Sequence, residues 1–569
     1  MPQDAFTLKY LCAEFNEVFA NGKVNRIIQP SNDEIMLTVY TSKKCTKKML
    51  INVNPSSPRI SICNQEKDSP LTAPNFCMLM RKHLLSATIL GVELVGFDRI
   101  VKIDFLSCGE FFDAVKKTLY IELMGRYSNI ILTENGKILG GNRGINMFDN
   151  GVRPLIVGKE YVYPPVNDKK LPNDKDLINI FANINNDNIA EIICKNIQGI
   201  ATSTAKEIEE KFLSKFNQNL SENFASELFN FINDYLYNTT KKPCVIVEDN
   251  LVKDVCVYPY NLTGEIIEFD YLFEAEDYYF EKKDNLKIFK SKFERLNGII
   301  NSAIKKAKKK IVSISSREND ALSAEENRLK GELILANIYR LKDGEKVCIL
   351  DNYYDGSKIE ILLDERLSIS KNAENYFKKY NKQKRTLDAL KPQKEQAQKE
   401  LDYFNSVSDE IALAENIFDL DLIKVELEKA GLIVEKQAKA KKKKEESVFY
   451  REYLVDGFII KAGRNNAEND KLTFSSPQTD TWLHAKDYHS SHLIIESGGR
   501  EIPDKVLAIA CEICAYYSRG RDGGKTEVVY TLRKNVKKPP KSKLGFCTYD
   551  NYKSMVVSPK KHTEFLKNE

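Results

Sequence analysis

The sequence lacks the features of a membrane or secreted protein. No segment approaches about 18 consecutive apolar residues, the length that a membrane helix needs. The first residues, MPQDAFTLKYLCAEF, have no cationic start followed by an apolar core, so we expect no secretory signal. The twelve cysteines lie mostly inside apolar segments, which is typical of reduced, buried thiols. We therefore predict a cytoplasmic protein without a membrane partner.

Motifs of catalysis and metal binding are also scarce. There are only five histidines, and we find no Ser/His/Asp context, nucleophile elbow or dinucleotide fingerprint. The one CxxC pair, Cys511 and Cys514, lies in AIACEICAYYS, which favours a helix with two small core residues. The segment SRGRDGGKT is one residue short of a phosphate-binding loop, and a strand follows where a helix is needed. We expect no catalytic residue, cofactor or bound metal.

The charge is distributed unevenly along a chain that is long enough for several domains. The chain has 569 residues, of which 42% are hydrophobic, and a formal net charge of +5. Residues 521–569 alone carry 12 Lys and Arg against 5 Asp and Glu, so the other residues together carry about two negative charges. A basic end of this kind favours a phosphate-bearing partner.

Five regions follow from the apolar patterns, and together they predict an α+β multidomain protein. Residues 1–170 alternate helical and strand patterns and end near GKEYVYPP, whereas residues 171–272 look mainly helical. Residues 273–435 have the pattern of a long antiparallel coiled-coil arm with a small insert. A charged linker, residues 436–446, precedes a compact α/β unit at residues 447–569.

The arm is predicted from apolar residues that recur in steps of three and four. A helix from Leu286 to Leu341 would be ~84 Å long at 1.5 Å per residue. A hairpin-like insert follows, and a second helix runs from about Lys371 to Glu415, with a kink expected at Pro392. The lysines at 305–310 crowd one face, which is either a solvated helix surface or an RNA contact.

Gly199 lies in NIQGIATSTAKEIEEKF, between two short predicted helices. This is the outline of a helix-hairpin-helix, whose Gly-containing turn can present backbone N–H groups to a phosphate. A plain helical turn with a glycine at its C-terminal cap is equally consistent with the spacing.

The segment from Ala73 to Leu132 has the densest mixture of charged and apolar residues. It contains APNFCMLMRKHL, GFDRIVKIDF and IELMGRYSNIIL. Asp98 and Arg99 precede a predicted strand, where Arg can make a forked bond to phosphate or a base edge and Asp can accept a hydrogen bond. An ordinary surface ion pair is the alternative. Glu122 is either a satisfied buried carboxylate or part of a binding surface.

A second candidate surface lies in GRNNAENDKLTF and TDTWLHAKDYHSSHLII. The only tryptophan, Trp482, lies near three histidines, His484, His489 and His492. Zinc is one interpretation, but the spacing matches no strong metal pattern. The position beside Arg464 and Lys486 favours stacking on RNA bases and phosphate contact. The alternative is that Trp482 belongs to the core and the histidines cap strands.

The three phrases of residues 73–132, in this order, resemble the NFACT family, and the resemblance runs nearly end to end. It implies a glycosylase-like N-terminal α/β domain, a helix-hairpin-helix domain with its turn at Gly199, the arm, and a C-terminal RNA-binding domain. The tRNA-binding residues that it implies are Asp98, Arg99, Glu122, Met124 and Arg126. In the C-terminal domain it implies RNA contacts at Arg464, Asn465, Trp482, His484, Lys486, His492, Lys537 and Lys538. Departures from the family pattern occur at Leu123 and Tyr127, and at Tyr488 and His489.

The resemblance also implies a function in ribosome-associated quality control. Such a protein binds the large (50S) ribosomal subunit that holds a stalled peptidyl-tRNA with its nascent chain. It recruits alanyl-tRNA, so that untemplated alanines extend the nascent chain, while the ribosome performs the peptide-bond chemistry. A small S4-like RNA-binding protein is a further implied partner.

Two other functions are weighed against this one. Old family labels suggest a cell-surface fibronectin-binding adhesin, against which the missing export signal and the cysteine usage count. A DNA glycosylase-like enzyme would use the amine of Pro2 as its nucleophile. Those glycosylases have Glu after this proline and end in a zinc finger, whereas Gln3 stands here and the CxxC is a lone one.

Overall fold

The computed structural model divides the chain into two compact units, Met1–Asp284 and Asn285–Glu569. It describes residues 3–67, 69–70, 72–108, 114–143, 153, 155–165, 168–182, 188–216, 223–259, 264–433, 450–540 and 542–568. Pro2 and the predicted linker 436–446 lie outside these residues. The finer domain boundaries of the sequence analysis stay predictions.

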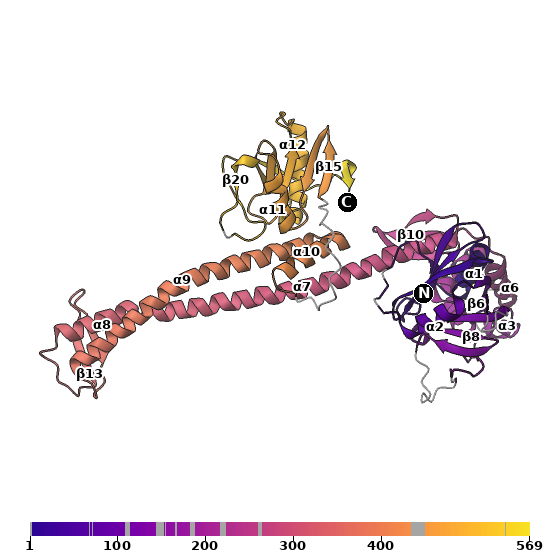
Figure 1. The fold of residues 1–569 in the computed structure, drawn as a ribbon, viewed down its shortest axis with the longest axis horizontal. Helices are drawn as coiled ribbons and strands as arrows, with labels where there is room; N and C mark the ends of the chain where they lie inside the picture. The colour runs from indigo at the N-terminus through magenta and orange to yellow at the C-terminus, as the bar shows by residue number, and fades with distance from the viewer. Residues whose placement is uncertain are drawn as a thin grey trace. The chain divides into compact units, whose positions relative to one another are not determined.

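The first unit is built on an antiparallel sheet, which has nine strands within the described residues (Figure 1). Its strand order is β4-β3-β2-β1-β5-β6-β7-β8-β9. The strands are β1 (Lys23–Ser31), β2 (Glu34–Tyr40), β3 (Thr46–Asn52), β4 (Arg59–Ile62), β5 (Thr88–Leu94), β6 (Ile100–Cys108), β7 (Ala114–Glu122), β8 (Asn129–Glu134) and β9 (Lys137–Gly141). Neighbouring strands are mostly consecutive in the chain, as hairpin connections require.

Two helices pack on this sheet, as the spacing of their apolar residues predicts. In α1 (Ala5–Phe19) the residues Leu8, Leu11 and Phe15 are fully buried, and Asp4 caps the helix by accepting from the Thr7 amide. In α2 (Asn75–Leu84) the buried residues include Phe76, Met80 and Leu84. The alternation of helix and strand predicted for this region is confirmed.

Among its described residues, the rest of the first unit contains four helices, a small sheet and the beginning of the long helix α7 (Leu272–Leu322). The helices are α3 (Asp176–Phe181), α4 (Ile189–Asn196), α5 (Thr202–Phe216) and α6 (Phe224–Asn238). The sheet, ordered β11-β10-β12, contains β10 (Cys244–Glu248), β11 (Leu251–Cys256) and β12 (Glu265–Glu268). The mainly helical prediction missed these strands. Their signal was the two-residue turn Asp249–Asn250, both residues with positive φ, between two apolar runs.

Gly199 does form the turn between two helices, but it faces the protein interior. Its φ is +77°, and a Cβ there would lie 2.3 Å from the Phe97 carbonyl oxygen and 2.6 Å from the Ala5 Cβ. Its carbonyl accepts from the Ala5 amide at 2.9 Å, and the nearby Ala201 amide donates to Asp4 Oδ2 at 3.0 Å. The turn therefore joins the helices to α1 and to the loop before β6. Phosphate binding at this turn stays a prediction.

The second unit begins with a helical arm. The helix α7 (Leu272–Leu322), which starts in the first unit, is followed by α8 (Ala324–Ala336), the hairpin β13 (Val347–Asp351) and β14 (Lys358–Leu362), and then α9 (Ile369–Leu413) and α10 (Ile417–Lys429). Figure 1 shows α7 and α9 side by side, and Leu296 and Ile300 pack against Tyr403 and Val407. The antiparallel arm and its hairpin insert are confirmed.

The prediction of a single helix from Leu286 to Leu341 is wrong, because the helix is interrupted at Ser323, between α7 and α8. There the Ser323 hydroxyl donates to the Asp320 carbonyl and accepts from the Gln383 side chain of α9 at 2.9 Å. The Ser323–Asp320 bond is local and competes with helix continuation. By contrast, α9 continues as one helix through Pro392.

The C-terminal part of the second unit is a sheet ordered β22-β19-β17-β18-β16-β15-β23. Its strands are β15 (Arg451–Val455), β16 (Phe458–Ala462), β17 (Thr481–Ala485), β18 (Leu493–Glu496), β19 (Thr526–Leu532), β22 (Lys553–Val557) and β23 (Leu566–Asn568). The helix α12 (Asp504–Tyr516) packs with Leu483 and Ile495, and α11 (Asn466–Ser475) packs with Trp482 and Ile494. A short pair, β20 (Val536–Lys537) and β21 (Thr548–Tyr549), completes the part.

The predicted helical core role of the CxxC pair is confirmed. Cys511 and Cys514 are fully buried in α12, and burial raises the pKa of the Cys511 thiol to about 12. Thiols of this kind are inert. The described residues include no helix with the length and apolar content needed to cross a bilayer.

We predict that Gly199→Ala lowers the free energy of unfolding of the first unit by more than about 2 kcal/mol, because the new Cβ meets backbone on a positive-φ residue. The control is Gly158→Ala, where φ is +84° and no atom lies within 4 Å of the added Cβ. There only the cost of the backbone angle, about 1 kcal/mol, is expected. Urea unfolding followed by circular dichroism measures both variants. Equal losses would contradict the close packing of the Gly199 turn.

Candidate nucleic-acid interface

The sheet register brings two predicted binding segments together. In the β6–β7 pair, Ile100 lies opposite Glu122, and beyond this pair the Leu123 amide donates to the Arg99 carbonyl at 2.9 Å. Asp98 and Arg99, just before β6, therefore adjoin Glu122 at the end of β7 and the residues that follow it, among them Met124 and Arg126. Residues more than twenty positions apart in sequence form one edge of the first unit.

Asp98 is half-buried, and its carboxylate accepts two hydrogen bonds. Its Oδ1 accepts from the Arg99 amide at 2.7 Å, and its Oδ2 accepts from the Gln198 side chain at 3.0 Å. Because Gln198 precedes Gly199, Asp98 links the helical turn to the edge of the sheet. Arg99 is also half-buried. These contacts define the direction of the Asp98 carboxylate, whose remaining lone pairs suit a donor on RNA.

Glu122 is a satisfied buried carboxylate. It is 3% exposed, and Arg153 grips it with two bonds, Nη1 to Oε2 at 3.1 Å and Nη2 to Oε1 at 2.7 Å. Tyr161 donates its hydroxyl to the same carboxylate at 2.7 Å. Burial and the adjacent Glu122 both raise the pKa of Tyr161. Of the two roles considered for Glu122, the structure favours the structural one.

The exposed part of the edge is the 3₁₀ turn η1 (Gly125–Tyr127). Gly125 has a φ of +58°, a backbone conformation that favours glycine. Met124 is half-buried, whereas Arg126 and Tyr127 are exposed. The Arg126 guanidinium carbon lies 4.7 Å from the centre of the Tyr127 ring. Tyr127 was noted in the sequence only as a departure from the family pattern.

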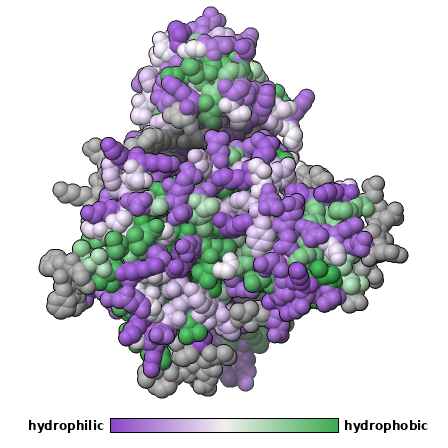
Figure 2. Space-filling model, turned by 90° about the vertical axis from the view of Figure 1, so that its right-hand side faces the viewer, coloured by the Kyte–Doolittle hydropathy of each residue, from purple (hydrophilic) through white to green (hydrophobic). Residues whose placement is uncertain are grey.

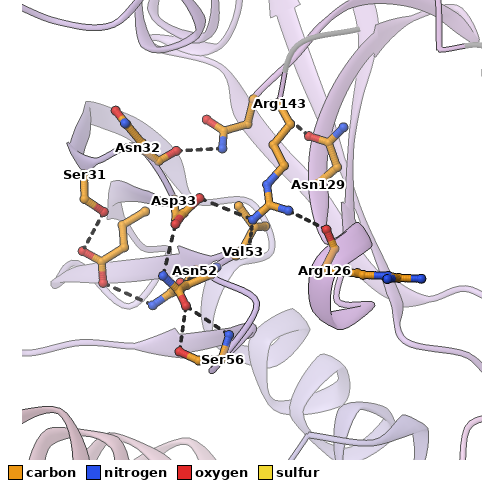
Figure 3. Close-up of polar contacts among 12 residues, drawn as sticks. Ser31, Asn32, Asp33, Asn52, Val53, Ser56, Arg126, Asn129 and Arg143 are labelled. Atoms are coloured by element: carbon orange, nitrogen blue, oxygen red, sulfur yellow. Dashed lines mark hydrogen bonds and ion pairs between the residues drawn. The ribbon is translucent and has the colours of Figure 1, made fainter. Parts of the chain in front are cut away.

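Arg143 connects this turn to the rest of the sheet (Figure 3). Its Nη1 donates to the Arg126 carbonyl at 2.7 Å, and its Nη2 donates to the Val53 carbonyl at 2.7 Å and pairs with Asp33 at 3.4 Å. Its own amide donates to the Asn129 side chain at 3.0 Å. The sequence analysis missed Arg143, since bonds to main-chain carbonyls leave no residue pattern.

The surface of the first unit is mixed in character. Figure 2 shows hydrophilic residues interleaved with separate hydrophobic patches. Exposed apolar residues of this unit include Met78, Tyr127, Val162 and Tyr163. A surface of this kind suits RNA, whose bases stack on rings while its phosphates require charges and hydrogen-bond donors.

The aromatic cluster of the C-terminal part is internal, which corrects the predicted stacking role. Trp482 is fully buried, with His484 stacked on it at 5.6 Å between ring centres. His492 is 1% exposed, and its Nδ1 lies 2.8 Å from the Thr473 hydroxyl. A buried ring offers no face to an RNA base. Trp482 therefore belongs to the core, the alternative considered above.

Arg464 and Asn465 also have internal roles. Arg464 and Arg451 pair with the two oxygens of Asp419 on α10, each at 2.8 Å, and all three side chains are buried. Asn465 caps α11 by accepting from the Glu468 amide at 2.9 Å. The Arg464 pair connects the sheet to the arm, so its charge is directed inward rather than toward a phosphate.

The lysines differ in how much of their charge reaches solvent. Lys486 pairs with Glu527 at 3.1 Å, and Lys538 pairs with Asp470. Lys537 is 72% exposed at its side chain and lies 3.6 Å from Asp550. Lys537 is therefore the predicted RNA contact of this part that the structure leaves most open. The described residues contain no group of three or more His, Cys, Asp and Glu suited to a metal ion.

Comparison with known proteins identifies the family. Residues 4–446 match the NFACT N-terminal and middle domains, and residues 447–545 match the NFACT protein RNA binding domain. The chain belongs to the NFACT family.

Two curated relatives match nearly end to end. The Rqc2 homolog RqcH of Bacillus subtilis is 30% identical over 556 residues, 96% of each chain. The Rqc2 homolog RqcH of Streptococcus pneumoniae is 30% identical over 575 residues, 98% of each chain. Among solved structures, the N-terminal part of the fibronectin/fibrinogen-binding protein from Streptococcus suis is 23% identical, with a TM-score of 0.42, and covers 49% of this chain and 98% of that chain.

We predict that acid weakens the C-terminal part through the buried His492 and the half-buried His484. Burial lowers the pKa of His484 to about 4 and of His492 to about 3. In the unfolded chain these rings protonate near pH ~6.5, so below that pH the unfolded state binds more protons. Their contribution to stability is complete above pH ~6.5 and falls by about 1.4 kcal/mol per pH unit and ring as the pH drops toward about 4.

Trp482 is the only tryptophan, so its fluorescence follows unfolding of this part. We expect His492→Asn to be less stable than the wild type near neutral pH but to show a smaller loss on acidification, because one titrating ring is gone. Parallel loss in both proteins between about pH 7 and about pH 5 would contradict this explanation.

We further predict that Asp419→Asn lowers the free energy of unfolding by about 3 kcal/mol, because two buried guanidinium groups lose their counter-charge. The matched control is Asp421→Asn on the same helix, whose exposed pair with Lys292 contributes less than about 1 kcal/mol. Trp482 fluorescence in urea measures both. Similar losses of unfolding free energy for the two variants would show that the Asp419 ion pairs stabilise the protein no more than an exposed pair does.

Proposed function

We propose that the chain is a ribosome-associated quality control factor. It binds the large (50S) ribosomal subunit that carries a stalled peptidyl-tRNA, and it recruits alanyl-tRNA for untemplated addition of alanine to the nascent chain. The end-to-end similarity to two RqcH relatives supports this function, together with the match to the NFACT RNA binding domain. The function belongs in the cytoplasm, where ribosomes work.

The observation that carries the proposal is the contact between the Asp98–Arg99 segment and the Glu122–Arg126 segment. In the proposed function, Arg99 and Arg126 contact tRNA phosphate or base edges, and Asp98 accepts from a base or ribose. Glu122 and Arg153 hold the end of β7. Lys537 is the most accessible of the proposed ribosomal RNA contacts. Peptide-bond formation stays with the ribosome, and a small S4-like protein is a proposed assistant.

The glycosylase alternative receives no support from the position of Gln3. This residue is 3% exposed, its side chain exchanges hydrogen bonds with the backbone of Ile60, and it also bonds to Glu276. The residue next to Pro2 is thus held inside the unit. Borohydride trapping on damaged DNA would detect a covalent intermediate, and we expect none.

The proposal is tested by purifying the whole chain from cells and sequencing the RNA that copurifies with it. We expect enrichment of one tRNA together with large-subunit ribosomal RNA. The double variant Asp98→Asn and Arg99→Gln should lower tRNA recovery at least about tenfold, equivalent to about 1.4 kcal/mol of lost contacts, and keep the ribosomal RNA.

The matched control removes an exposed ion pair of the same unit, with Glu17→Gln and Lys43→Gln, and should leave tRNA recovery unchanged. Melting curves verify that both double variants stay folded. Bulk RNA without enrichment in the wild type, or undiminished tRNA with the Asp98 and Arg99 variant, would overturn the proposed function.

A further inference from the structure

The turn η1 holds an aromatic ring outward on the edge that carries Asp98 and Arg99. Tyr127 is 67% exposed, so most of its ring is open to solvent. The Arg126 guanidinium lies against the ring at 4.7 Å, in the geometry of a cation–π pair. An exposed ring backed by a cation combines the two groups on which nucleic-acid bases stack.

The turn is fixed by bonds to its main chain rather than by packing of the ring. Arg143 binds the Arg126 carbonyl and, with the same guanidinium, the Val53 carbonyl and Asp33 (Figure 3). In this view the Arg126 side chain points away from the Arg143 cluster. One arginine thus joins the β1–β2 turn, the end of β3 and η1, so that the ring is presented without being enclosed.

We propose that Tyr127 and Arg126 form a stacking platform for an unpaired base of bound RNA, and that Arg143 is the positioning residue that holds the platform in place. This inference rests on the proposed function, which makes tRNA the RNA that binds here in the cell. The base stacks on the Tyr127 ring, while the adjacent Asp98 and Arg99 contact its backbone or sugar. Because every base has an aromatic face, the platform selects unpaired over paired nucleotides rather than one base.

Charge and position favour RNA over an apolar protein segment as the occupant. The platform contains a guanidinium, and the Leu123–Arg99 backbone bond connects its strand directly to the second arginine of the edge. A cation against one exposed ring, with a second arginine on the neighbouring strand, suits a polyanion that carries aromatic bases. An apolar protein segment would gain little from these charges.

The test uses the full chain and a short single-stranded RNA that contains one 2-aminopurine, whose fluorescence is quenched by stacking. Addition of the wild type should lower the fluorescence of the single-stranded probe. Addition to the same RNA in a duplex should cause no further decrease. Tyr127→Phe should behave as the wild type, because the ring is kept. Tyr127→Ala should lose the quenching and bind the single strand about tenfold more weakly.

The positioning role of Arg143 is tested with the same readout. Arg143→Gln should reduce the quenching while Tyr127 remains present, and Arg143→Lys should restore part of it. The matched control is Tyr258→Ala, which removes another exposed tyrosine of the first unit that lies 4.3 Å from a lysine ammonium, that of Lys211. This control should quench and bind as the wild type does.

Each result has a definite meaning. Unchanged quenching and affinity in Tyr127→Ala, equal losses in Tyr258→Ala, or no binding of the probe by the wild type would overturn the platform. Full quenching by Arg143→Gln would overturn the positioning role. A wild type that quenches the probe but enriches no tRNA from cells would overturn the proposed function and leave the platform standing. If Tyr127→Ala enriched tRNA from cells as strongly as the wild type does, the platform alone would be overturned.

Discussion

The pairing of β6 with β7 is the constraint on which the candidate interface depends. Ile100 lies opposite Glu122, and the Leu123 amide continues the pairing to the Arg99 carbonyl. A slip of one residue would turn every side chain of the strand to the other face of the sheet. The register therefore decides that the Asp98–Arg99 segment and η1 share one edge. Gln198 and Arg143 then attach the helical turn and the β1–β2 turn to that edge.

A buried ionic network has the corresponding role in the second unit. Asp419 on α10 compensates Arg451 and Arg464, and Glu426 accepts from Tyr403 and Asn466 in the same region. Such groups are costly to bury and tolerable only when each has its partner. In sequence, Arg464 looks like an RNA contact. In the structure its pair with Asp419 instead connects the sheet to the arm.

The sequence predicted the elements well where apolar spacing decides them. The α1 and α2 helices, the antiparallel arm and the strands around Arg451–Ala462 follow from periodicity. The break at Ser323 depends on a hydrogen bond from Gln383 of another helix, which no local pattern reveals. At the proposed site, the sequence predicted Asp98, Arg99 and Arg126 as tRNA contacts, and these stay predictions. It could not distinguish an exposed Trp482 from a buried one, and it missed Arg143, which acts through main-chain carbonyls of distant segments.

The central claim is that the edge formed by Asp98, Arg99 and η1 is where this NFACT protein holds tRNA. Ultraviolet crosslinking in cells, followed by mass spectrometry of the nucleotide-bearing peptides, tests it most directly. The account predicts tRNA crosslinks in the peptides that contain residues 97–99 and 122–127, with ribosomal RNA crosslinks in the C-terminal part around Lys537. Crosslinks of tRNA confined to the second unit, with none at this edge, would contradict it.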